Sequence, residues 1–304
     1  MGYSLYYMLT TRCNLCCRYC FRDYTKQTIA AELSVDSIKK VVAKLYRDFG
    51  VRKLTLSGGE PTFIKNDNCQ SFIELMDDLR QYKHDNKEDN LRIVLITNAV
   101  LLTEKAIRHM VGVVDRITIT IDALDEDVLT SLGRNTPKYN SYVERSFNRI
   151  KFLSDMGFEI KLHSVVTPLN YDSLVELAKY ISVRNDIRII KWKLFQYMGF
   201  GNTVADEEFR IDETKYWALK SKLEEILFSC NTKVSFKSID DQEQSLFDLL
   251  PDGTFEYLST QNGQKQRHHS KPVFEYDSWE KLLADCPIDE NMFRRLHVYN
   301  PQGN

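Results

Sequence analysis

Both the fold and the chemistry of this chain follow from the segment Thr10-Thr11-Arg12-Cys13-Asn14-Leu15-Cys16-Cys17-Arg18-Tyr19-Cys20-Phe21. It continues an apolar run, Ser4–Thr10, that predicts a first β-strand. Its cysteines at positions 13, 17 and 20 have the spacing C-x3-C-x2-C. Three thiolates can hold three irons of a 4Fe–4S cluster and leave the fourth iron open for a ligand. The predicted metal ligands are therefore Cys13, Cys17 and Cys20.

Other uses of the cysteines fit less well. The chain has seven, an odd number, and four of them stand within positions 13–20, which favours metal ligation over a disulfide framework. A zinc site usually takes two separated pairs of ligands, and the sequence has no second pair. A closed cluster on four cysteines would need the adjacent Cys16 and Cys17 to point at one centre.

A second motif, Leu56-Ser57-Gly58-Gly59-Glu60-Pro61, directly follows the second predicted strand. Its two glycines let the backbone approach a ligand closely, and Glu60 can accept hydrogen bonds from an ammonium group. Alone, these residues are typical of a surface turn. One βα unit after the cysteines, they support a ligand site at the carboxyl edge of a parallel sheet.

Strand-like and helix-like segments alternate over the first 230 residues. Strands are predicted at Ser4–Thr10, Lys53–Leu56, Arg92–Thr97, Arg116–Ile121, Glu159–Val165 and Ile187–Phe195. Helices are predicted at Val35–Phe49, Cys69–Lys83, Thr103–Met110, Tyr142–Met156, Tyr171–Ile181 and Asp212–Ser229. Six βα units in series predict a parallel sheet with right-handed crossovers, which both open sheets and barrels satisfy.

Alternate residues of these strands form a polar set on one face. The set comprises Lys53, Thr55, Ser57, Thr118, Thr120, Asp122, Glu159, Lys161, His163, Lys191 and Lys193. Helices cover both faces of an open α/β sheet, whereas a partial barrel encloses a polar cavity, which favours the barrel. The lysines are expected to converge near the cavity mouth, and buried lysines imply a polyanionic ligand. The alternative is that they lie at frayed strand ends in water.

The pattern changes after residue 230. Val234–Lys237, Ser245–Leu249 and Thr254–Leu258 predict a small hairpin region around Pro251-Asp252-Gly253. The polar stretch Asn262–Lys271 is expected to be an exposed loop, and two short helices follow at Ser278–Ala284 and Asp289–Leu296. We therefore expect a partial barrel over residues 1–230 and a C-terminal extension over 231–304 that packs on the barrel mouth.

Composition excludes several classes of protein. Lys plus Arg total 41 and Asp plus Glu total 43, and a net charge of −2 argues against broad binding to nucleic acid. No apolar stretch is long enough to cross a membrane, and the first residues lack the charge pattern of a signal peptide. The chain is expected to be cytoplasmic, with no nucleic-acid or membrane partner.

Together the two motifs resemble those of the radical S-adenosylmethionine superfamily, in which a C-x3-C-x2-C triad holds a 4Fe–4S cluster and a GGEP motif binds the amino group of the S-adenosylmethionine methionine. The resemblance implies that Cys16, which lies outside the triad, is a free thiol. Within it, the chain is most similar to viperin and the prokaryotic viperin-like enzymes. The further matches are Leu132-Gly133-Arg134-Asn135, Lys161-Leu162-His163-Ser164-Val165, Lys191-Trp192-Lys193-Leu194-Phe195-Gln196 and Asp289-Glu290-Asn291-Met292-Phe293. The resemblance implies an α/β fold, a partial (β/α)6 barrel of the radical S-adenosylmethionine type with a small C-terminal extension.

The resemblance also implies the site residues. Contacts to S-adenosylmethionine are expected from Tyr19, Phe21, Ser57, Gly58, Gly59, Glu60, Asn98, Thr120 and Arg134. Contacts to substrate are expected from Lys53, Thr55, Lys161, His163, Lys191 and Lys193. No catalytic acid is assigned.

The activity implied is that of viperins, which convert a ribonucleoside triphosphate to its 3′-deoxy-3′,4′-didehydro form, a chain terminator used in antiviral defence. Such a lyase forms a 5′-deoxyadenosyl radical from S-adenosylmethionine, abstracts the ribose C4′ hydrogen and releases the 3′-hydroxyl as water. A flavodoxin- or ferredoxin-type protein is the expected electron donor.

Departures from the family leave alternatives open. Thr55 and His163 stand where the cytidine-using enzymes have asparagine, so the base preference is not carried over, and the family's Asn-Gly after the third strand is Asn98-Ala99 here. The second hypothesis is a radical S-adenosylmethionine enzyme that modifies a peptide or natural product. Many of these have auxiliary clusters, for which Cys230 and Cys286 are too few. A non-enzymatic iron–sulfur protein would have no use for the glycine motif.

Overall fold

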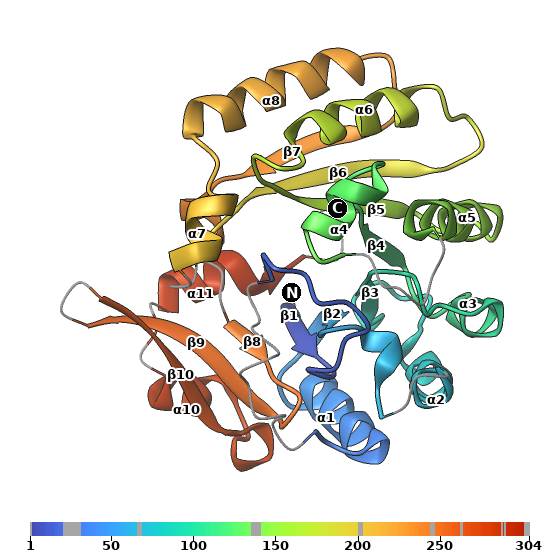
Figure 1. Ribbon diagram of the computed structural model, residues 1–304. Coiled ribbons are helices and arrows are strands. Elements are labelled where there is room, and N and C mark those ends of the chain that lie inside the picture. Colours follow the sequence, from blue (N-terminus) through green and yellow to red (C-terminus); the bar gives the residue numbers. More distant parts are fainter. Residues whose placement is uncertain are drawn as a thin grey trace.

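One curved sheet organises the chain (Figure 1). The computed structural model describes residues 2–20, 32–65, 69–134, 141–199, 203–243, 247–261, 264–286, 288 and 290–300. The strands are β1 (Gly2–Met8), β2 (Val51–Ser57), β3 (Arg92–Thr97), β4 (Arg116–Thr120), β5 (Ile160–Val166), β6 (Ile189–Gln196), β7 (Lys233–Lys237), β8 (Phe247–Leu249), β9 (Thr254–Gln261), β10 (Gln264–Pro272) and β11 (Val298–Tyr299).

Helices connect most of the strands. They are α1 (Val35–Arg47), α2 (Gln70–Leu79), α3 (Glu104–Met110), α4 (Glu126–Ser131), α5 (Tyr142–Asp155), α6 (Tyr171–Ser182), α7 (Thr203–Phe209), α8 (Glu213–Ile226), α9 (Ile239–Glu243), α10 (Trp279–Asp285) and α11 (Glu290–His297). Short 3-10 helices are η1 (Pro61–Phe63), η2 (Arg80–Tyr82) and η3 (Val273–Glu275). Within the described part of the chain, no helix is long and apolar enough to cross a membrane.

The predicted partial barrel is confirmed. Strands β1 to β7 lie side by side in chain order, and each pair of neighbours is parallel. Figure 1 shows α1, α2, α3, α5, α6 and α8 around the outside of the curved sheet. Leu54, Ile117 and Leu162 are fully buried in the core between sheet and helices. The sheet is not closed, because the path of paired strands ends at β7 and at β10.

Local sequence signals explain the helices that were predicted. Ser34 caps α1 by accepting a hydrogen bond from the Ser37 amide, and Ser141 does the same for α5. The buried face of α1 contains Ile38, Val41 and Leu45, at the spacing of a single helix face. Each of the six predicted strands is present, with bounds shifted by at most two residues at either end.

Three helices were not predicted: α4, α7 and α9. Each has seven residues or fewer, which is two turns at most. Two turns give a weak hydrophobic period, so helices of this length are easily missed, although α3 and α10, with seven residues each, were predicted.

The C-terminal segment extends the sheet at both of its edges. The predicted hairpin around Pro251-Asp252-Gly253 is confirmed, since β8 and β9 are antiparallel and Gly253 has φ +85°. The assignment of Val234–Lys237 to that region is wrong, because β7 pairs in parallel with β6. The division at residue 230 stays a prediction, since strands from both sides of it share one sheet.

The prediction of an exposed loop at Asn262–Lys271 is also wrong. Gln264–Pro272 is strand β10, which is antiparallel to β9. In this ribbon His268 stacks on Tyr257, and His269 lies 3.7 Å from the buried carboxylate of Glu256. The pairing is set by the partner strand, so polar residues can form a strand without an alternating apolar face.

The end of the chain packs at the amino end of β1. Strand β11 is antiparallel to β1, with Tyr299 opposite Gly2. His297 Nδ1 lies 3.0 Å from the carbonyl oxygen of Ser4. The ammonium group of Lys53 lies 5.8 Å from the centre of the Tyr299 ring. Residues 297–299 therefore contact the end of the barrel opposite to the cysteine segment, and the packing of the whole extension on the barrel mouth stays a prediction.

Candidate active site

The cysteine segment and the glycine motif lie against each other. The amide of Gly59 donates to the carbonyl of Thr10 at 2.8 Å, and the amide of Glu60 donates to the carbonyl of Arg12 at 2.8 Å. A Cβ atom on Gly59 would lie 2.3 Å from the Arg12 oxygen, and one on Gly58 would lie 2.6 Å from the Thr10 oxygen. The glycines therefore allow the backbone of the cysteine segment, and not only a ligand, to approach closely.

Three of the four clustered cysteines are placed differently from the fourth. Cys13, Cys17 and Cys20 are half-buried, whereas Cys16 is exposed. Burial raises the pKa of Cys13 to about 12, and the neighbouring charges of Cys17 and Cys20 raise it further. Burial raises the pKa of Cys17 to about 11. The three thiols are thus close to one another in a site where a positively charged group would be needed to keep them ionised.

A cluster fits these thiols better than a single metal ion does. Among the described residues, no three Cys, His, Asp or Glu side chains are grouped so as to hold one metal ion. In a 4Fe–4S cluster each thiolate binds a different iron, so the sulfur atoms stand further apart than around zinc. The exposure of Cys16 agrees with its interpretation as a free thiol.

Glu60, the acidic residue of the glycine motif, is fully buried against the end of β3. Its Oε1 accepts hydrogen bonds from the hydroxyls of Thr62 and Thr97, both at 2.7 Å, and its Oε2 accepts one from the Asn98 amide at 2.8 Å. Burial raises the pKa of Glu60, and these donors oppose the rise. A carboxylate oxygen can accept two donors, so Oε2 retains capacity for an ammonium group.

Asn98 joins this carboxylate to the cysteine segment. Its Nδ2 donates to Asn14 Oδ1 at 2.9 Å and lies 4.0 Å from the sulfur of Cys13. The next residue, Ala99, has φ +63°, a left-handed conformation that glycine adopts at lower cost. This left-handed backbone conformation explains why glycine suits the position that Ala99 occupies here.

A buried ion pair lies on the other side of the cysteine segment. Arg134 Nε is 3.0 Å from Asp122 Oδ2, and their side chains are 4% and 0% exposed. Tyr19 donates to the same carboxylate oxygen at 2.5 Å and accepts from Arg134 at 2.9 Å. Arg134 also lies 3.9 Å from the sulfur of Cys17. Asp122 was not among the predicted site residues, although its position just after β4 in the polar set pointed to it.

The remaining residues expected at S-adenosylmethionine are placed as follows. The Ser57 hydroxyl donates to the Tyr7 carbonyl at 3.5 Å, and the Thr120 carbonyl accepts from Arg134 at 2.8 Å. Phe21 lies outside the described residues. The expected contacts of these residues with a cofactor stay predictions.

The predicted lysines do lie together, on the inner face of the barrel. Burial lowers the pKa of Lys161 to about 8 and that of Lys193 to about 8. The pKa of Lys161 is also lowered by the nearby charges of Arg116, Lys191, Lys193 and Lys53. The four lysines all lie within the first five residues of their strands, toward the amino ends. The cysteine segment, in contrast, follows the carboxyl end of β1. The lysines therefore lie deeper than the mouth position expected from the sequence, away from the cysteines.

Thr55 and His163 share this inner face but differ in access. Thr55 is 3% exposed, whereas His163 is half-buried and lies opposite Lys193 on β6. Burial and the neighbouring lysines hold the pKa of His163 well below its usual value, so the imidazole is neutral. A neutral imidazole offers one donor and one acceptor to a ligand.

Further inner-face residues were missed. Arg92, Arg116 and Lys237 contribute positive charge at Lys53 and Lys193. Arg116 alternates with Thr118 and Thr120 along β4, so the same pattern of alternate polar residues could have predicted that Arg116 lies on the inner face. Tyr6, 40% exposed, lies opposite Thr55 on the neighbouring strand.

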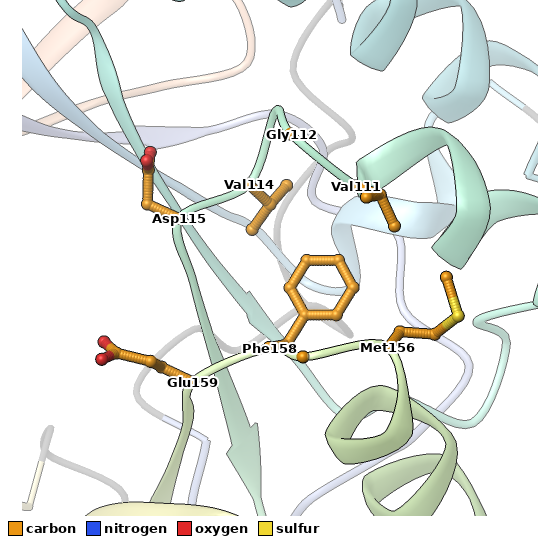
Figure 2. A pocket seen from close by; sticks show the side chains of 8 residues that line it. Val111, Gly112, Val114, Asp115, Met156, Phe158 and Glu159 are labelled. Carbon is orange, nitrogen blue, oxygen red and sulfur yellow. The ribbon is translucent and has the colours of Figure 1, made fainter. Parts of the chain in front are cut away.

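A separate pocket of about 260 Å³ lies at the amino ends of β4 and β5 (Figure 2). Figure 2 shows the carboxylates of Asp115 and Glu159 on one side and apolar side chains, including Phe158, on the other. Asp115 already accepts hydrogen bonds from Lys83 at 2.5 Å and from the Ile93 amide at 2.6 Å. The pocket lies away from the cysteine segment and is not the candidate active site.

The chain is similar in sequence to several known proteins. A model described as "Radical SAM superfamily" matches residues 7–181. A "GTP 3',8-cyclase" of Staphylococcus haemolyticus (strain JCSC1435) is 26% identical over 64% of this chain and 54% of its own length. The "S-adenosylmethionine-dependent nucleotide dehydratase RSAD2" of Oncorhynchus mykiss is 25% identical over 95% of this chain and 78% of its own. The chain thus spans about half the length of the cyclase.

Among solved structures, Streptococcus suis SuiB bound to S-adenosylmethionine is similar with a TM-score of 0.67. The match covers 97% of this chain and 67% of that chain at 14% identity. At this identity the similarity concerns the fold alone.

Proposed function

The chain belongs to the radical S-adenosylmethionine superfamily, and we propose that it is a nucleotide dehydratase that converts a ribonucleoside triphosphate to its 3′-deoxy-3′,4′-didehydro form. Its cofactors are those of the superfamily, a 4Fe–4S cluster and S-adenosylmethionine. The proposal rests on the cation-lined inner face of the barrel together with the length over which the dehydratase of Oncorhynchus mykiss aligns.

Residues at the carboxyl ends of the strands would hold the cofactors. Cys13, Cys17 and Cys20 would bind the cluster, and Glu60 Oε2 would accept from the amino group of S-adenosylmethionine. When bound, these cofactors supply a carbon radical that can abstract a hydrogen atom from substrate. The buried Arg134–Asp122 pair holds Tyr19, and with it the part of the cysteine segment that contains Cys17 and Cys20.

The inner-face lysines indicate a polyanionic substrate. Lys53, Lys161 and Lys193 each have a lowered pKa, which records burial of positive charge among other positive charges. Such a group is costly in the free protein and is stabilised when a ligand of opposite charge binds. A triphosphate bound here would direct the nucleoside toward the cysteine end, where the ribose must lie for hydrogen abstraction. The protein's contribution is then to position that ribose.

Alignment length supports dehydration over cyclisation. The dehydratase aligns with 95% of this chain, including the C-terminal segment, whereas the cyclase aligns with 64%. Modification of a peptide or natural product is the other alternative. Cys230 contacts the carbonyl of Ser182 at the end of α6, and Cys286 directly follows α10. These positions are near opposite ends of the sheet, which does not favour an auxiliary cluster between the two cysteines. The electron donor, the antiviral role and the cytoplasmic location stay predictions.

An anaerobic screen of the four ribonucleoside triphosphates tests the function. The reconstituted enzyme is incubated with S-adenosylmethionine, a reductant and each nucleotide, and the products are identified by mass spectrometry. We expect one nucleotide to increase the yield of 5′-deoxyadenosine and to give a product that has lost one water. A product of unchanged mass from GTP would indicate cyclisation, and no response to any nucleotide would contradict the proposal.

Replacement of Lys161 by alanine is expected to weaken nucleotide binding ten- to a hundredfold, because a charge-assisted hydrogen bond contributes roughly 1.5–3 kcal/mol. Lys53→Ala and Lys193→Ala should behave similarly, and Lys191→Ala should have a smaller effect. Binding is measured by isothermal titration calorimetry. The iron content and the binding of S-adenosylmethionine should not change. Equal nucleotide affinity in the wild type and in the three main variants would exclude this face as the phosphate site.

The base preference is expected to differ from that of the cytidine-using enzymes, or to be relaxed. Thr55 offers one hydroxyl and His163 one donor and one acceptor, where two asparagines would offer two complete amides. A polar site discriminates against a ligand that leaves its groups unpaired. The double variant Thr55→Asn, His163→Asn should therefore shift product yields toward CTP. A strict preference for CTP in the wild type, unchanged in the double variant, would contradict this expectation.

A further inference from the structure

Arg116 lies at the end of the barrel interior that is furthest from the cysteine segment. It is the first residue of β4, and it shares the inner face with Thr118 and Thr120. Thr118 lies opposite Lys161 on β5, so Arg116 is one inward-facing position deeper than that lysine. In addition to burial, the positive charge of Arg116 lowers the pKa of both Lys161 and Lys53, so Arg116 lies near lysines from two different strands.

The guanidinium of Arg116 is only partly satisfied. One nitrogen lies 3.2 Å from Glu159 Oε2. Its Nε is buried and has no hydrogen-bond partner among the described residues. The side chain is 21% exposed. A buried donor without an acceptor is costly, and an anionic oxygen at this position would satisfy it.

Glu159 is the residue that holds Arg116 in the free protein. It immediately precedes β5, and its backbone carbonyl accepts from the Ile117 amide at 3.1 Å, so the two residues are fixed side by side. Its side chain is 37% exposed and lines the pocket shown in Figure 2. The carboxylate therefore has space to move away from Arg116 without disturbing the core.

The positions of the inner-face cations along the barrel axis indicate which phosphate of a bound triphosphate would contact Arg116. With the ribose near the cysteine segment, successive phosphates extend toward the amino ends of the strands. Along strands β6, β5 and β4, Lys193 comes first in this direction, Lys161 comes next and Arg116 comes last. We propose that Arg116 binds the terminal phosphate of the triphosphate, that Glu159 holds Arg116 until substrate arrives, and that this pair selects triphosphates over diphosphates. The inference rests on the proposed function and adds a specificity-determining residue to it.

Binding measurements on the full chain without cofactors test the inference. The ligands are CTP, UTP, ATP and GTP and the four corresponding diphosphates, measured by isothermal titration calorimetry. Arg116→Ala is expected to weaken triphosphate binding about ten- to a hundredfold and diphosphate binding less than about threefold, since only the former loses a charged contact. Arg116→Lys should restore part of the affinity. Arg188→Ala, an exposed arginine at the same end of the sheet, is the matched control and should change neither affinity.

Glu159→Gln is expected to increase the affinity for triphosphate, a result that a variant with a folding defect would not give. It should tighten triphosphate binding by about three- to tenfold, because Arg116 is no longer neutralised. In the Arg116→Ala background the same change should have no effect, since Glu159 acts through Arg116. An unchanged ratio of triphosphate to diphosphate affinity in Arg116→Ala would overturn the inference and leave the proposed function intact. Absence of nucleoside triphosphate binding in the wild type would overturn both.

Discussion

Replacement of Cys17 by alanine is expected to abolish both the cluster and the cleavage of S-adenosylmethionine, whereas Cys16→Ala should retain both. Cys17 is half-buried beside Cys13 and Cys20, and Cys16 is exposed. A cluster with an open iron needs all three thiolates, so the loss of one leaves two irons without protein ligands. Iron content, the visible absorbance of the reconstituted protein and the yield of 5′-deoxyadenosine measure the outcome.

The two variants are matched, because both remove one thiol from the same segment. The exposed position of Cys16 makes a folding defect unexpected in that variant. Cys69→Ala provides a further control, since its thiol donates to the Leu101 carbonyl at 3.0 Å, away from the triad. A cluster that survives Cys17→Ala but is lost in Cys16→Ala would show that the assignment of ligands is wrong.

Replacement of Asp122 by asparagine is expected to lower the free energy of unfolding by about 3–5 kcal/mol, because it leaves a buried guanidinium without its counter-ion. The Arg134 side chain is 4% exposed and the Asp122 side chain is inaccessible. The change also weakens the hydrogen bond from Tyr19, so the support of the cysteine segment is lost as well. Anaerobic urea denaturation of the chain without cofactors measures the effect.

An exposed ion pair supplies the control for this experiment. Asp186 lies beside Arg184 on the surface, and Asp186→Asn should leave the denaturation midpoint unchanged. The variant Arg134→Met, Asp122→Leu replaces the pair with apolar groups and should recover part of the stability without restoring the contact to Tyr19. A loss of less than about 1 kcal/mol in Asp122→Asn would show that water reaches the guanidinium.

The sequence alone determined the parts of this protein that depend on local pattern. The C-x3-C-x2-C spacing of the family predicted Cys13, Cys17 and Cys20 as cluster ligands, which stays a prediction, and the structure leaves Cys16 more exposed than these three. The alternation of polar and apolar residues predicted an inner face with lysines, and hydrophobic periodicity predicted six βα units. Spacing and periodicity are properties of neighbouring residues, so they are visible before folding.

Only the tertiary structure decided what depends on residues distant in sequence. The polar stretch after Asn262 forms strand β10 because it pairs with β9, and β7 belongs to the parallel sheet because it pairs with β6. The close contact of Gly59 with Arg12, the burial of Asp122 against Arg134 and the pairing of Arg116 with Glu159 all join separate strands or loops. Such contacts are fixed by register and packing between elements, which no local pattern encodes.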